Sequence, residues 1–248
     1  ADTLECDGAK IALMCENRPE WAVSYLAILT AGATAVPLDA HLNEHELNLI
    51  LDHVEADAIV CSVKTYETLQ RVLPDVSSLG TVIVLDRTYI VRKDHNGETR
   101  WSAFLEKIRP MTRHAAFLSY VELRERGIER SKGTPPPFPE RGVDDIASII
   151  YTSGTTGTPQ GVMLCHRNFI QNVSSIHSKL HMVPDDTVLL LLPLHHVLPF
   201  TGCLVLALSY GCNLCFVDIL SRARQRLIME GRPTIMIGVP LLYVKIYK

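Results

Sequence analysis

The sequence has little net charge. Its 24 lysines and arginines nearly balance 27 aspartates and glutamates over 248 residues, for a formal net charge of −3. A chain without an excess of positive charge is not typical of nucleic-acid-binding proteins, so we expect no nucleic-acid partner. Hydrophobic residues make up 47% of the chain, which indicates a substantial core, and the length suits one or two domains.

The sequence also lacks a zinc-type cysteine pattern. Cys212 and Cys215 enclose two residues, but no second pair or histidine cluster follows at metal-ligand spacing. We interpret both as apolar strand residues and expect no metal site built from protein side chains. Seven cysteines, an odd number, favour a reducing intracellular compartment, and we expect a cytoplasmic protein.

No apolar run is long enough to suggest a membrane span, which needs about 20 mostly apolar residues. The longest apolar stretch, 200–217, is interrupted by small and polar residues. It therefore predicts a buried helix, a turn and a strand, and peripheral contact with a membrane stays open. The first seven residues are acidic and mixed, which is not typical of a signal peptide.

Short apolar runs alternate with helical patterns along the chain. Strands are expected at 11–15, 58–61, 81–85, 147–151, 188–192, 214–217 and 234–238, with a short extended piece at 36–38. Helices are expected over 19–31, from Asn43, from about Arg167, over 198–209 and from Ser221. Repeated βα units of this kind predict an α/β fold with mostly parallel sheets flanked by helices.

The chain divides by regularity into three parts. Residues 1–87 form a first βα part, and residues 142–248 form a second that holds the glycine-rich loop described next. Residues 88–141 between them are irregular and charged, with one or two helices and a stiff proline-rich linker. Within the first part, Gly32 is expected to end a helix, and Asn43 with Glu46 resembles a capping box.

The strongest chemical signal is the segment 151–162, YTSGTTGTPQGV. A buried strand runs into a loop of glycines and hydroxyls, and we expect a helix to follow. Glycines let backbone N–H groups turn toward a ligand, and the hydroxyls add further donors, so the loop suits phosphate oxygens. The spacing matches neither a Walker A loop nor a dinucleotide-binding fingerprint.

This segment resembles the phosphate-binding signature of the adenylate-forming superfamily, which includes acyl-CoA synthetases, luciferases and peptide-synthetase adenylation domains. Three other regions are similar to family motifs in order and spacing: 17–38 (NRPEW, then AGATAVPL), 192–196 (LPLHH) and 233–240 (PTIMIGVP). The resemblance spans nearly the whole chain. It implies an incomplete large N-terminal domain of the acyl-CoA synthetase-like fold, so we expect a fragment.

The resemblance implies a reaction in two halves: a carboxylate attacks the α-phosphate of Mg²⁺-ATP, and coenzyme A then takes the acyl group from the acyl-adenylate. It assigns phosphate binding to Thr152, Ser153, Gly154, Thr155, Thr156, Gly157, Thr158 and Gln160. It places His196 near the acyl carboxylate and the α-phosphate, with His195 in the pocket wall. The family usually has lysine where this chain has Gln160, which offers only a neutral donor.

The residues 193–200 and 239–243, and the irregular excursion, are most similar to long-chain fatty acyl-CoA ligases. The family's later motifs are not found, so the 248-residue chain is expected to be inactive alone. Two alternatives stay open. One is another adenylate-forming domain, which activates an amino acid or loads a carrier protein, and the other is a truncated, non-catalytic member of the family.

Overall fold

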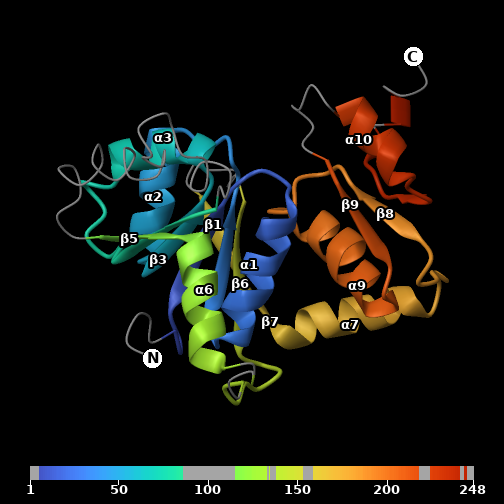
Figure 1. The fold of residues 1–248 in the computed structure, drawn as a ribbon, viewed down its shortest axis with the longest axis horizontal. Coiled ribbons are helices and arrows are strands. Elements are labelled where there is room, and N and C mark those ends of the chain that lie inside the picture. The colour runs from blue at the N-terminus through green and yellow to red at the C-terminus, as the bar shows by residue number, and fades with distance from the viewer. Residues whose placement is uncertain are drawn as a thin grey trace. The chain divides into compact units, whose positions relative to one another are not determined.

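A computed structural model describes most of the chain: residues 6–85, 115–132, 134, 138–152, 159–217, 224–240 and 243–244. The chain forms two compact units (Figure 1). The first comprises Ala1–Cys15, Ser24–Arg141 and Ala147–Met163, and the second comprises Glu16–Val23, Gly142–Ile146 and Leu164–Lys248. Most of the expected excursion and the proline run 135–137 lie outside the described residues, and the three-part division stays a prediction.

The first unit is built on a sheet that has seven strands among the described residues, in the order β5-β4-β3-β1-β2-β6-β7. The central strand β1 pairs in parallel with β2 and β3, so that Met14 lies opposite Leu38 and Cys61. Strand β4 pairs in parallel with β3 and β5, and β6 with β2. The prediction of mostly parallel sheets is confirmed. The strands are β1 (Lys10–Met14), β2 (Thr34–Leu38), β3 (Ala58–Cys61), β4 (Thr81–Val84), β5 (Ala116–Ser119), β6 (Ile146–Thr152) and β7 (Gln160–Cys165).

Local signals fix the ends of two helices where the sequence predicts them. Helix α1 (Pro19–Thr30) is followed by Gly32, which stops the helix with a φ of 77° that glycine adopts without strain. Helix α2 (Glu44–Val54) begins at a capping box: Asn43 Oδ1 accepts from the Glu46 N–H at 3.0 Å, and Glu46 Oε2 accepts from the Asn43 N–H at 3.1 Å. Both predictions are confirmed.

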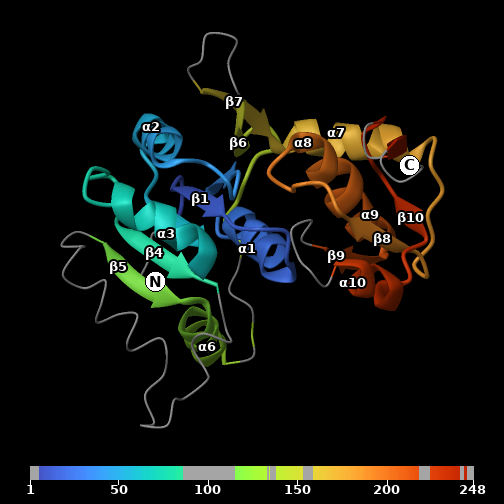
Figure 2. The same cartoon turned by 90° about the horizontal axis from the view of Figure 1, so that it is seen from above.

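One buried cluster of the first unit lies between the sheet and two helices, α2 and α3 (Val63–Val72). Alternate residues of four strands face these helices, because side chains of a strand point to the two faces in turn. The views in Figures 1 and 2 place α1 and α6 (Tyr120–Ser131) on the opposite face. The strand residues in this cluster include Ala12, Met14, Val36, Leu38, Ile59, Cys61, Val82 and Val84.

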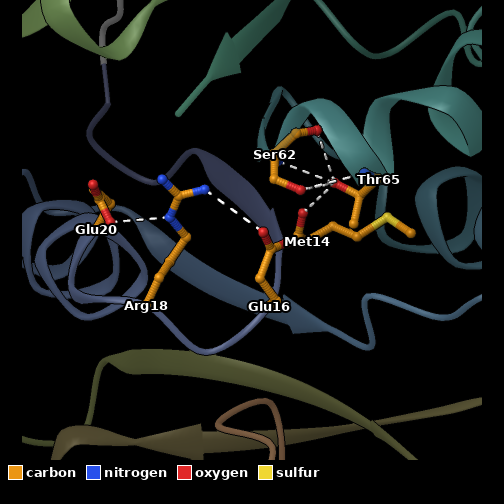
Figure 3. A network of polar contacts seen from close by, with 6 residues as sticks. All are labelled: Met14, Glu16, Arg18, Glu20, Ser62 and Thr65. Atoms are coloured by element: carbon orange, nitrogen blue, oxygen red, sulfur yellow. Dashed lines mark hydrogen bonds and ion pairs between the residues drawn. The ribbon is translucent and has the colours of Figure 1, made fainter. Parts of the chain in front are cut away.

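Helix α3 is tied to the central strand by a buried polar contact (Figure 3). Ser62 caps the helix, and its Oγ accepts a hydrogen bond from the Thr65 N–H at 3.3 Å. The Thr65 hydroxyl donates to the carbonyl of Met14 at 2.7 Å. Both side chains are buried, so these bonds satisfy polar groups that would otherwise be costly to bury.

The second unit has three strands among its described residues, in the order β10-β8-β9, with β8 parallel to both neighbours. Leu189, Leu191 and Val217 form its small buried cluster. The strands are β8 (Thr187–Leu190), β9 (Asn213–Phe216) and β10 (Ile235–Met236). The helices are α7 (His166–His177), α8 (Val197–Pro199), the π-helix η2 (Phe200–Val205), α9 (Leu206–Tyr210) and α10 (Arg224–Gly231).

The single helix expected over 198–209 is observed as three segments, with the π-helical segment η2 between α8 and α9. Pro199 contributes no N–H to the helix, and the wider turns follow it; the N–H of Leu206 donates to the carbonyl of Thr201, five residues earlier. None of the helices in the described ranges combines the length and the apolar character that a membrane crossing requires.

Candidate functional site

The predicted phosphate loop leaves the first sheet at the carboxyl end of β6. Thr152 is the last residue of that strand and is exposed. Gln160 is the first residue of β7 and is also exposed. The structure therefore brings the two ends of the loop to neighbouring strands. The other six candidates, Ser153, Gly154, Thr155, Thr156, Gly157 and Thr158, lie outside the described residues.

The element after the loop corrects one expectation. A strand, loop and helix were expected in direct succession, but β7 stands between the loop and α7. The helix itself begins at His166, one residue before its expected start near Arg167. The sequence QGVMLC of β7 can extend the sheet because it neighbours β6, and this pairing is not visible from local sequence alone.

Gly161 allows β7 to pass close to the side chains of β6. A Cβ added at Gly161 would lie 2.9 Å from Ile149 Cγ2 and 3.2 Å from Tyr151 Cζ. Tyr151 is held in place by a 2.6 Å hydrogen bond between its hydroxyl and His53 Nδ1, at the end of α2. Burial raises the pKa of Tyr151, so the phenol is the form present near neutral pH. The strand that leads into the loop is thus anchored one residue before Thr152.

The first turn of α7 is fixed to the segment 143–145. Arg167 forms two parallel hydrogen bonds with Asp144, Nε to Oδ1 at 2.6 Å and Nη2 to Oδ2 at 2.7 Å. The backbone N–H groups of His166 and Arg167 donate to the carbonyls of Asp145 and Val143. The Arg167 hydrogen bond also holds the pKa of Asp144 below its usual value.

His196, the second candidate centre, lies in the turn between β8 and α8. It is the N-terminal cap residue of α8, its side chain is exposed, and its N–H donates to the carbonyl of Pro193 at 3.2 Å. His195 is half-buried, and the two imidazole centroids are 4.0 Å apart. His196 belongs to the second unit, whereas Thr152 and Gln160 belong to the first.

Sequence reasoning assigned no role to Asn17, which holds this turn from the loop before α1. Its Nδ2 donates to the carbonyls of Leu190 at 3.1 Å and Leu192 at 2.8 Å. Its Oδ1 accepts from the N–H of Leu194 at 3.0 Å. The only signal in the sequence is that Asn17 stands in the NRPEW segment, because its partners are more than 170 residues away.

The loop that carries Asn17 is braced by charged side chains (Figure 3). Arg18 lies between two carboxylates, with Nε 3.0 Å from Glu20 Oε2 and Nη1 3.7 Å from Glu16 Oε1. The Arg18 side chain is only 19% exposed, so these ion pairs are less screened by solvent than surface pairs. The carbonyl of Arg18 also accepts from the N–H of Trp21, at the start of α1.

Aromatic packing fixes the helical segment that follows His196. Phe200 lies between two rings, with centroids 6.0 Å from Trp21 and 5.3 Å from Phe169 of α7. All three side chains are buried, and rings in tilted or edge-on contact add stability beyond their buried area.

Among the described residues, no group of three or more histidine, cysteine, aspartate or glutamate side chains could hold a metal ion. None of the seven cysteines, all of which are described, takes part in a disulfide.

Known proteins match this chain along nearly its whole length. Long chain acyl-CoA synthetases 6 and 7, peroxisomal, from Arabidopsis thaliana are 28% and 30% identical over 242 residues. Each match covers 97% of this chain and 32% of the relative. Long-chain-fatty-acid–CoA ligase 5 from Rattus norvegicus is 27% identical over 249 residues, covering 96% of this chain and 33% of that protein. The chain therefore spans about a third of the length of these relatives.

Solved structures share the fold. ATP-bound MatB from Rhodopseudomonas palustris superposes with a TM-score of 0.67 at 23% identity, over 96% of this chain and 41% of that one. The N-terminal domain of FACL13 from Mycobacterium tuberculosis gives the same TM-score at 24% identity, over 95% of this chain and 51% of that one. The profile of the AMP-binding enzyme family matches residues 6–248. The chain belongs to the AMP-binding enzyme family.

Proposed function

We propose that this chain supplies the phosphate loop and part of the carboxylate site of a long-chain fatty acid–CoA ligase. The observation that carries the proposal is the segment 151–162, which leaves the carboxyl end of the parallel strand β6. Ligands of open parallel sheets bind outside the carboxyl ends of the strands. Because the chain spans about a third of its relatives, the reaction is proposed for a protein that also holds the remaining segments, and the 248 residues alone are expected to be inactive.

In the proposed reaction, a carboxylate oxygen of the fatty acid attacks the α-phosphorus of ATP. The bond from that phosphorus to the bridging oxygen breaks, and pyrophosphate leaves. The thiolate of coenzyme A then attacks the acyl carbon, and AMP leaves. Catalysis of the first step requires mainly positioning and stabilisation of charge on the phosphoryl oxygens.

The loop residues would bind the β- and γ-phosphates. Thr152, Thr155 and Thr156 would donate hydroxyl hydrogen bonds, and the backbone N–H groups around Gly154 and Gly157 would add further donors. Gln160 would contribute a neutral amide donor from the start of β7. Mg²⁺, when bound to ATP, would neutralise phosphate charge, and we assign it no protein ligand.

His196 would act on the acyl side of the reaction. Its exposed imidazole stands at the start of α8, free to approach a substrate carboxylate or α-phosphate oxygen as a hydrogen-bond donor. The adjacent side chains Val197 and Leu198 are 45% and 53% exposed, so apolar surface stands beside the imidazole. A long acyl chain fits such surroundings better than the side chain of a polar amino acid.

ATP–pyrophosphate exchange tests this function on the 248-residue chain and on any longer product of the same gene. The substrates would be acetate, hexadecanoate and a panel of amino acids. We expect exchange with hexadecanoate from the longer product. Exchange with an amino acid alone would favour an amino-acid-activating or carrier-loading domain, and no exchange from a folded longer product would favour a non-catalytic family member.

The loop assignment has its own test at Gln160. We expect Gln160→Lys to lower the Kd for Mg²⁺-ATP by on the order of 3- to 10-fold, because a charge-assisted hydrogen bond to phosphate is about twice as strong as a neutral one. Isothermal titration would measure this Kd, with Gln171→Lys on the exposed surface of α7 as a control for added charge. Equal gains in both variants would contradict the assignment.

The proposed function also has consequences for where the protein resides and for its contact with membranes. Seven cysteines without a disulfide suit a reducing compartment, and we propose the cytoplasm. A fatty acid partitions into membranes, so peripheral contact of the protein with lipid is part of the proposal. A flotation assay with phosphatidylcholine vesicles would measure that contact; protein that stays at the bottom of the gradient would contradict it.

A further inference from the structure

The turn that carries His196 depends on partners from outside its own sequence. Residues 191–193 connect β8 to the start of the turn, and Pro193 has no N–H to donate. The one hydrogen bond shown within the turn joins the His196 N–H to the Pro193 carbonyl, among described residues. Leu194 is buried, at 1% exposure, so its backbone N–H requires a partner inside the protein.

Asn17 meets this requirement with its whole side-chain amide. Its Nδ2 donates to the carbonyls of Leu190 and Leu192, and its Oδ1 accepts from the Leu194 N–H, at 2.8 to 3.1 Å. Two acceptors on one side and one donor on the other fix the orientation of the amide. Three bonds to alternate residues hold this segment in one extended course up to the residue before His195.

The loop that presents Asn17 is itself fixed on both sides. Glu16 and Glu20 hold Arg18 by ion pairs, and the next residue of α1, Trp21, packs on Phe200 at 6.0 Å. Phe200 follows His196 by four residues, and its N–H donates to the His196 carbonyl at 3.1 Å. The short segment 16–21 therefore contacts the chain both before and after His196.

We propose that Asn17 is a positioning residue, which sets the backbone from which the His196 imidazole projects. We call the three hydrogen bonds from the Asn17 amide to Leu190, Leu192 and Leu194 the clamp, and the observed geometry alone supports it. Its consequence for catalysis rests on the proposed function, in which His196 approaches the substrate. A displacement of about 1 Å at such a group can lower a rate by on the order of 100-fold, because the reacting atoms must meet in a narrow range of distances.

Amide hydrogen exchange followed by NMR tests the clamp without any assumption about activity. In the wild-type 248-residue chain, we expect the Leu194 amide to be protected, although it lies outside every helix and strand. Asn17→Ala should speed its exchange by on the order of 10-fold or more. Asn17→Leu should do the same, since it keeps the approximate size of the side chain but loses the acceptor oxygen of the Leu194 N–H together with both N–H donors. Asn172→Ala, on the exposed surface of α7, is the matched control and should leave the Leu194 amide unchanged.

The His196 imidazole gives a signature that a general loss of stability would not produce. In Asn17→Ala, the ring resonances of His196 should shift or broaden while those of His53 and His177, held by their own hydrogen bonds, stay in place. In a longer product that supports exchange of pyrophosphate, kcat should fall by on the order of 10- to 100-fold, with KM for ATP changed less than about twofold.

The outcomes separate the two claims. An unprotected Leu194 amide in the wild type, or wild-type protection in Asn17→Leu, overturns the clamp, and the first of these needs no variant to fold. Unchanged His196 resonances in Asn17→Ala overturn the positioning role. A clamp in the 248-residue chain, together with no pyrophosphate exchange from a folded longer product of the gene, overturns the proposed function and leaves the positioning of His196 standing.

Discussion

Gly161 occupies a place in the sheet where a side chain has no room. Its backbone lies against the side chains of Ile149 and Tyr151 on the neighbouring strand, and a Cβ would come within 2.9 Å of the first. Contacts this short force either the strand or its neighbours to move. Tyr151 has little freedom to do so, because it is hydrogen-bonded to His53 and packs against the buried cluster between the sheet and helices α2 and α3.

We expect Gly161→Ala to lower the free energy of unfolding by about 1–3 kcal/mol. Urea denaturation of the 248-residue chain would measure it. Gly127→Ala in α6 is the matched control, because no atom lies within 4 Å of the added Cβ. Alanine in a helix interior is favoured over glycine by about 0.5–1 kcal/mol, so this control should gain stability. A loss of the same size in both variants would contradict the close packing at Gly161.

Asp186 organises the edge of the second sheet. Its carboxylate accepts from the Val183 N–H at 2.9 Å and from the Thr234 hydroxyl at 2.7 Å. The Val183 hydrogen bond and then the Thr234 bond hold the pKa of Asp186 below its usual value. A carboxyl whose pKa is lower in the folded state stabilises the fold above its unfolded pKa of about 3.9, and this contribution is lost as the pH falls through the folded-state pKa.

Asp186→Asn should therefore lower stability at neutral pH, and its difference from wild type should shrink as the solution is acidified. Urea midpoints over a pH series that reaches below the folded-state pKa would show this. Asp185→Asn changes the neighbouring exposed carboxyl and should have little effect at any pH. A deficit of Asp186→Asn that is the same at every pH would show that the carboxylate charge is not responsible.

At the scale of helices and strands, the sequence predicts those whose ends are set by residues close by in the chain. The ends of α1 and α2 depend on Gly32 and on the Asn43–Glu46 box, which act within a few residues. Strands β5 and β7 were not predicted, because AFLS and QGVMLC are short and half-exposed and become strands by pairing at the sheet edges. Helix α3 was also missed, although Ser62 and Thr65 form a local cap.

The cap of α2 can be tested directly. Asn43→Ala should cost about 1 kcal/mol of unfolding free energy, because the Glu46 N–H loses its side-chain acceptor. Asn43→Ser keeps a capping oxygen and should stay within about 0.5 kcal/mol of wild type. Urea denaturation and the helical circular dichroism signal would measure both. If serine and alanine were equally destabilising, the cap would not be the reason.

The distinction between signals that act within a few residues and contacts that form only in the folded chain also applies to the candidate site. The loop 151–162 and His196 were found because their residues are contiguous in the sequence and match family motifs. The Asn17 contacts join residues 173 to 177 positions apart, so only the folded chain reveals them. Local chemistry is therefore readable from the sequence, whereas the contacts that position it depend on tertiary packing.

For the whole molecule, alternation of strands and helices predicted the parallel sheets, since βα units bury a sheet on both faces. The division into two units was not foreseen in this form, because the segment 16–23 joins the second unit although it precedes most of the first. This segment carries Asn17, so the early part of the chain contributes directly to the surroundings of His196.

The most direct test of the central claim is to isolate the intermediate from a gene product long enough to match the relatives. The protein would be incubated with Mg²⁺-ATP and hexadecanoate without coenzyme A, and the mixture analysed by mass spectrometry. We predict hexadecanoyl-adenylate at no more than about one equivalent per protein, which disappears when coenzyme A is added while hexadecanoyl-CoA and AMP form. A folded protein that forms neither the adenylate nor the thioester would contradict the account.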